Sequence, residues 1–132
     1  MSAEHDIARQ WLIKARSDLL NADNNLAATC VPCDTVCFHC QQAAEKMLKA
    51  FLSAKGIPPP RIHDLLLLMQ EILKHTTSVE NLRETLIILN PYAVAARYPD
   101  ENGDLPTLDD AREARRGADA VLTWLMHELP AV

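Results

Sequence analysis

Residues 37–56, CFHCQQAAEKMLKAFLSAKG, decide the fold. At 3.6 residues per turn this stretch predicts a helix of about five turns. Most of its residues are good helix formers, and apolar residues recur at steps of three and four. These residues make one wide apolar stripe: Cys37, Cys40, Ala44, Met47, Leu48 and Phe51. Because so wide a stripe must be covered from several sides, we expect this to be the central helix.

The sequence also indicates where this helix begins and ends and which residues form its polar side. We expect Asp34 to be its N-cap, with Pro32 just outside the helix. Gly56 and the three prolines that follow Ile57 predict its end, near Lys55. The narrower polar side consists of Gln42, Glu45, Lys46 and Lys49.

The composition is that of an ordinary globular protein, with 48% hydrophobic and 23% charged residues in 132. This length suits one domain with a single core. The net charge of −5 makes general nucleic-acid binding less expected, because such domains are usually basic. No apolar run is long enough for a membrane span, and the N-terminus does not resemble a secretory signal. We therefore expect a cytoplasmic protein with its four cysteines reduced.

The rest of the chain also reads as helices, each with its own start or stop signal. The first covers residues 3–28, and the next starts near His63 and Asp64. A capping box at residues 77–80 opens another helix, which is interrupted at Asn90 and Pro91 and followed by a helical turn at residues 92–96. The last helix runs from the capping signal at Thr107 to about Leu129. No segment alternates as a strand would. The sequence therefore predicts an all-α fold, an antiparallel up-and-down bundle of four to five helices.

Two apolar residues of the first helix lie away from its apolar face. Ile13 and Leu20 are seven residues apart, so they share the opposite face. Scattered surface hydrophobics are common, but an exposed apolar stripe can also mark an interface. Both interpretations, a plain surface and a seam for self-association, remain open.

Four segments, taken in order, resemble the HEPN domain, whose name stands for higher eukaryotes and prokaryotes nucleotide-binding. They are Trp11, Ala15, Asp18, Leu19 and Ala22; Phe38 with QQAAEK at residues 41–46 and Leu48, Lys49 and Ala50; His63, Asp64 and Leu65; and ARYPD at residues 96–100. The resemblance implies a single helical domain over residues 1–132, commonly homodimeric. It also implies a separately encoded minimal nucleotidyltransferase as partner, in a toxin–antitoxin-like pair.

Many members of the wider superfamily are metal-independent ribonucleases that use an Arg and a His separated by four to six residues. After Arg97, the corresponding positions here hold Asn102, Gly103 and Asp104. His is the side chain best suited to proton transfer near pH 7. We therefore expect a non-catalytic subunit that binds a nucleotide or a partner. The alternatives are a ribonuclease toxin whose acid–base residues lie outside this pattern, and a pure protein-interaction module.

Candidate ligand-binding residues come from two places. Arg97 could hold a phosphate and Tyr98 could stack on a base, with Asp100 beside them. In the alternative interpretation this segment is a structural corner, where Arg97 pairs with an acidic neighbour. The polar side of the central helix, Gln42, Glu45, Lys46 and Lys49, could hold the phosphates of ATP or GTP together with Arg112. Glu45 and Lys49 also have the i,i+4 spacing of a plain helix-supporting ion pair.

Two further groups have mainly structural interpretations. His63 and Asp64 are adjacent, so on a helix they would not face each other, and we expect them to start a helix rather than form a catalytic dyad. Cys30, Cys33, Cys37 and Cys40 have the spacing C-x2-C-x3-C-x2-C, which invites a zinc or iron–sulfur interpretation. Structural zinc sites usually place a dozen or more residues between their two ligand pairs. We expect no metal, with Cys37 and Cys40 acting as small core residues.

Overall fold

Three long helices and a group of shorter elements make up the fold in the computed structural model, which describes residues 2–95, 99 and 104–132. The elements are α1 (Ala3–Leu26), α2 (Cys33–Ala54), α3 (Leu65–Leu73), the 3-10 helix η1 (Ser78–Leu82), α4 (Arg83–Leu89), α5 (Tyr92–Ala95) and α6 (Leu108–Glu128). The described ranges contain no strand. The predicted all-α antiparallel bundle is confirmed.

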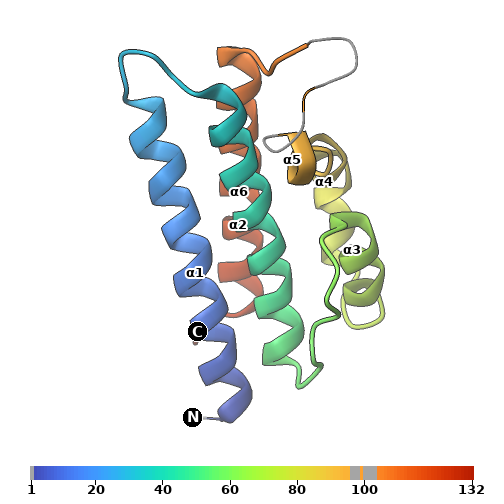
Figure 1. The fold of residues 1–132 in the computed structure, drawn as a ribbon. Helices are drawn as coiled ribbons and strands as arrows, with labels where there is room; N and C mark the ends of the chain where they lie inside the picture. Colours follow the sequence, from blue (N-terminus) through green and yellow to red (C-terminus); the bar gives the residue numbers. More distant parts are fainter. Residues whose placement is uncertain (1, 96–98, 100–103) are drawn as a thin grey trace.

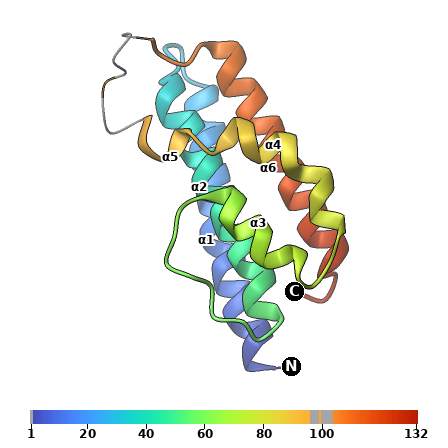
Figure 2. The same ribbon diagram turned by 90° about the vertical axis from the view of Figure 1, so that its right-hand side faces the viewer.

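Helix α2 lies at the centre of this bundle (Figure 1). It packs most extensively against antiparallel α1 on one side and against α6. The shorter elements α3, α4 and α5 cover its other side, as the turned view in Figure 2 also shows. No helix in the described part of the chain is long and apolar enough to cross a membrane.

The apolar stripe of α2 explains this central place. Fourteen of its 22 residues are buried, and all six residues of the predicted stripe are fully buried. Burying one Leu, Met or Phe side chain contributes about 1.5–3 kcal/mol, so α2 supplies a large share of the stabilising burial. The prediction of a central helix is confirmed.

The two ends of α2 compare differently with the sequence prediction. Asp34 is not the N-cap: Pro32 has that position, and its carbonyl accepts a hydrogen bond from the Val36 amide at 3.0 Å. Proline suits a helix start because its missing N–H would be unpaired there anyway, and Asp34 still favours the dipole from within the first turn. The predicted stop is confirmed: Gly56 has a φ of 77°, and the Ile57 amide bonds back to the Leu52 carbonyl at 3.0 Å.

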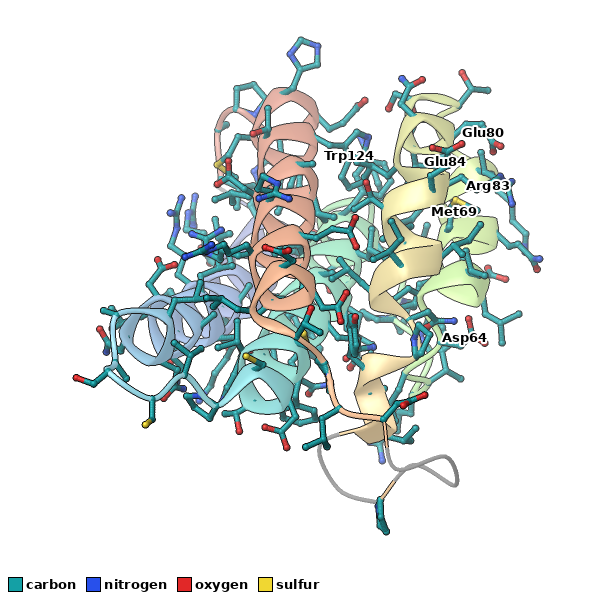
Figure 3. All side chains as sticks on the ribbon, turned by 90° about the horizontal axis from the view of Figure 1, so that it is seen from above. Asp64, Met69, Glu80, Arg83, Glu84 and Trp124 are labelled. Carbon is teal, nitrogen blue, oxygen red and sulfur yellow. The ribbon has the colours of Figure 1, made fainter. Side chains whose placement is uncertain are left out.

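Two capping signals in the sequence had different outcomes. Thr107 and Asp110 form the reciprocal capping box that opens α6. The box expected at residues 77–80 is wrong, because Thr77 makes no side-chain capping bond and the segment is a 3-10 helix. The Ser78 hydroxyl bonds instead to α6, accepting from the Trp124 indole at 2.9 Å and donating to Glu128. Seen from above, Trp124 extends from α6 towards η1 and α4 (Figure 3).

The contact between α4 and α6 depends on Gly117. A Cβ atom built there would lie 3.1 Å from the Thr85 methyl group and 3.6 Å from a Leu89 methyl group. The distance to Thr85 is tighter than ordinary van der Waals contact, whereas the distance to Leu89 is ordinary. The absence of a side chain at residue 117 therefore allows α4 to lie directly against α6.

Candidate functional site

The predicted polar side of α2 is in part buried. Glu45 is 4% exposed and Lys49 is 6% exposed, although the sequence pattern placed both on the polar side. The Lys49 ammonium donates to Glu45 Oε2 at 3.1 Å, so the predicted i,i+4 pair is confirmed. Because it lies within the packing of the bundle, this pair differs from the solvent-exposed ion pairs that contribute little.

Glu45 also ties α2 to the segment that precedes α3. Its Oε1 atom lies 2.9 Å from His63 Nδ1, and the Gln41 amide donates to the His63 carbonyl at 3.1 Å. The neighbouring Asp64 is the N-cap of α3 and accepts hydrogen bonds from the Leu66 and Leu67 amides. The predicted helix-start role is therefore confirmed for Asp64, and the ring of His63 contacts Glu45.

A second ionic cluster joins Asp18 of α1 to His39 and Lys46 of α2. Asp18 of α1 is 7% exposed and divides its two oxygens between α2 side chains. Its Oδ1 atom lies 2.9 Å from His39 Nδ1, and its Oδ2 atom accepts from the Lys46 ammonium at 2.5 Å. A buried carboxylate with both oxygens occupied orients the imidazole and the ammonium group together.

Sequence reasoning did not select Asp18 or His39 as site residues. The available signal was that Asp18 follows Trp11 by seven residues and thus lies on the apolar face of α1. A carboxylate in such a position needs a buried partner. The pattern could have indicated that a cation or a His from another helix faces it.

Trp11 also lies where α1 contacts α2. The Lys49 ammonium is 5.6 Å from the centre of the Trp11 ring, within cation–π distance. Next to the ring is a depression of about 310 Å³, lined by Ile7, Gln10, Trp11 and Lys14 of α1. The half-buried indole thus borders a shallow surface site.

The remaining ligand candidates are less closely connected. Gln42 donates to the Gln41 side chain at 2.7 Å. Arg112 is exposed and makes no hydrogen bond or ion pair within the described ranges. Its neighbour Arg115 bonds to Asp23 of α1 at 2.7 Å, which raises the pKa of the Arg115 guanidinium. Grouping of Arg112 with Lys46 and Lys49 around a phosphate stays a prediction.

Arg97, Tyr98 and Asp100 lie outside the described residues. Their predicted roles, a phosphate clamp with a stacking ring or a structural corner, stay predictions.

The cysteines differ strongly in environment. Cys30 is exposed and Cys33 is half-buried, whereas Cys37 and Cys40 are fully buried, as expected of core residues. Burial raises the pKa of Cys37 and that of Cys40 from 9.0 to about 12. Metals bind the thiolate, so burial disfavours binding through these two thiols. Among residues 2–95, 99 and 104–132, no group of three or more His, Cys, Asp or Glu is placed to hold a metal ion.

The buried Glu45 carboxylate should be essential for stability. Glu45→Ala would leave the Lys49 ammonium buried without its partner, so we expect a loss of about 3–5 kcal/mol in the free energy of unfolding. Glu71→Ala is the matched control, because Glu71 pairs with Lys74 on an exposed surface and should cost less than about 1 kcal/mol. Urea unfolding followed by circular dichroism measures both. Similar losses in the two variants would contradict the buried pairing.

The cysteine pKa values predict a loss of stability at alkaline pH. The unfolded chain ionises these thiols near pH 9.0, whereas the folded protein keeps its protons until about 12. Stability is therefore fully present below pH 9 and falls as the pH rises above it, by up to about 1.4 kcal/mol per pH unit for each thiol. Urea unfolding between pH 8 and 10.5 measures the slope. The Cys37→Ala/Cys40→Ala double variant should show a flatter dependence, and an unchanged slope would rule out these thiols as its source.

Comparison with known proteins agrees with this architecture. The model of the HEPN domain family matches residues 8–129. The crystal structure of an archaeal HEPN homologue is similar to this chain, with a TM-score of 0.73 and 25% sequence identity, and the match covers 92% of this chain and 97% of that one. A search among curated proteins found no significant match. The family match covers almost the entire length and agrees with the observed helical bundle. The chain therefore belongs to the HEPN domain family.

Proposed function

We propose that this chain is a non-catalytic HEPN-type subunit that binds a nucleotide or a partner protein. It works in the cytoplasm with a separately encoded minimal nucleotidyltransferase, as one half of a toxin–antitoxin-like pair. One observation carries the proposal: the chain keeps the family's helical scaffold but has Asn102, Gly103 and Asp104 where the ribonuclease members have His.

The charges on α2 support the same conclusion. Lys46 is bonded to Asp18 of α1. Lys49 is bonded to Glu45 of its own helix and lies 5.6 Å from the centre of the Trp11 ring of α1, so both cations are engaged in contacts within the protein. Reaction centres usually keep at least one acid–base group aimed at the substrate. Here these charged groups hold the bundle together, as expected of a subunit that presents a surface to a ligand or a partner.

A metal-independent ribonuclease is the second candidate. The observation that favours it is the contact of 2.9 Å between His39 and the buried Asp18. A carboxylate on Nδ1 fixes the ring so that Nε2 could exchange a proton with a substrate hydroxyl. This arrangement would place the acid–base group on α2, outside the usual pattern.

Incubation of the purified chain with RNA in the presence of a chelator separates the two candidates. We expect no RNA cleavage by the wild-type protein and no growth inhibition when it is produced alone. We also expect one of two binding results: saturable binding of ATP or GTP in calorimetry, or co-purification with a nucleotidyltransferase chain encoded beside it. RNA cleavage that both Arg97→Ala and His39→Gln abolish would overturn the non-catalytic proposal in favour of the ribonuclease. Arg61→Ala, an exposed Arg elsewhere, is the control for lost charge.

The subunit is further proposed to be a homodimer that pairs through the outer face of α1. Ile13 is 65% exposed and Leu20 is 61% exposed, so both predicted residues are available on that face. Exposed apolar residues that share one face of a helix favour association.

Changing Ile13 and Leu20 to Lys should therefore give a monomer. Both side chains are exposed, so the variant should remain folded, while the mass measured by light scattering should fall by half. Leu67→Lys is the matched control, because Leu67 is 45% exposed on α3, and this variant should stay dimeric. A monomeric wild-type protein, or a double variant that stays dimeric, would exclude this face as the interface.

A further inference from the structure

The line of contact between α1 and α2 brings together an aromatic ring and several cations. We call the α1–α2 seam the set made up of Trp11, Lys14 and Asp18 on α1 with His39, Lys46 and Lys49 on α2. On each helix these residues follow one another at three-, four- or seven-residue steps, so they share one face. Three contacts join the two faces: Lys49 to Trp11, Lys46 to Asp18 and His39 to Asp18.

We propose that the α1–α2 seam binds a nucleoside di- or triphosphate, with its base against Trp11 and its phosphates along Lys14 and Lys46. This inference rests on the proposed function, whose nucleotide it locates. The sequence pattern favoured Arg97 and Tyr98. The seam instead assigns the binding to side chains that the sequence pattern did not bring together.

The base would occupy the depression beside Trp11. Ile7, which is 49% exposed, forms part of its apolar wall, and Gln10 offers an amide for a polar edge of the base. Stacking on an indole is favourable for every base, because each has a π-face. The Lys49 ammonium lies 5.6 Å from the ring centre and restrains the indole before a ligand arrives.

The phosphates would extend from this depression towards Asp18. Trp11 and Asp18 are seven residues apart on one helix, so their positions differ by about 10 Å along the axis at 1.5 Å per residue. This distance suits the span from a stacked base to the phosphate chain. Lys14 lies between the two positions and is exposed, without an ion pair or hydrogen bond to another described residue.

The Asp18 cluster supplies the donors at the phosphate end. The Lys46 ammonium uses one donor on Asp18 and has others left for phosphate oxygens. Asp18 itself carries one negative charge, but the two ammonium groups of Lys14 and Lys46 outweigh it.

The seam is also compatible with a dimer through Ile13 and Leu20. On a helical wheel these two residues lie on the side of α1 opposite Trp11 and Asp18. A second copy placed there leaves the seam accessible.

Tryptophan fluorescence tests the base position directly, because the chain has two Trp residues. Trp124→Phe leaves Trp11 as the only emitter, and Trp11→Phe leaves Trp124, which is 8% exposed and packs against Phe51 at a ring-centre distance of 5.2 Å. We expect ATP or GTP to quench the emission of Trp11 alone, with the same dissociation constant that calorimetry gives for the wild type.

Two charge variants test the phosphate position. Lys14→Gln removes one phosphate partner and should weaken triphosphate binding about tenfold, as expected for the loss of a charge-assisted hydrogen bond. Lys74→Gln removes the same charge from exposed α3-flanking surface and should leave binding unchanged. Adenosine without phosphates should bind the wild type and Lys14→Gln equally.

The outcomes separate the seam from the proposed function. Calorimetric binding without quenching of Trp11 and without an effect of Lys14→Gln would place the nucleotide elsewhere, so the seam would be excluded while the proposed function stands. Absence of any nucleotide binding would exclude the seam and the nucleotide form of the proposed function together, leaving only partner binding. Quenching of Trp11 together with weaker binding by Lys14→Gln would establish the seam.

Discussion

The structure depends on how α2 accommodates charge inside the bundle. A helix with fourteen buried residues carries the Glu45–Lys49 ion pair in its packed surface. Burying opposite charges costs desolvation energy, and their attraction compensates only when the geometry is good and hydrogen bonds complete it. Here Glu45 receives a second contact from His63, so both of its oxygens are occupied. The position of α2 relative to its neighbours is thereby fixed by directional bonds as well as by apolar contact.

The same constraint acts on both sides of α2. Towards α1, Asp18 meets His39 and Lys46. Towards α3, Glu45 meets His63 and thereby holds the extended segment that leads to the Asp64 cap. Apolar burial is itself non-directional, so charged and hydrogen-bonded groups add a geometric preference to the packing. The ionic contacts select one register, and the alignment of Trp11, Lys14 and Lys46 depends on that register.

Local sequence pattern was sufficient for the elements but not for the site. The central helix, its stop at Gly56 and the cap at Thr107 follow from residues close in the chain, and all three were predicted. The burial of Glu45 depends on what α1 and the segment before α3 cover, which a single helix pattern does not contain. The contact of Asp18 with His39 joins residues 21 apart, so it was missed for the same reason. Thr77 failed as a cap because tertiary contacts made by the next residue decided the local conformation.

Gly117 shows how an absent side chain can control a surface. Glycine inside a helix costs about 1 kcal/mol relative to Ala, and here that cost accompanies the close approach of Thr85. The same residue lines a depression of about 250 Å³ between α4 and α6, together with Arg116 and Ile88. Gly117 is therefore one determinant of the spacing between the two helices. Side chains of increasing size at residue 117 would push α4 progressively away from α6. The shape of this face could therefore be changed by engineering that one residue.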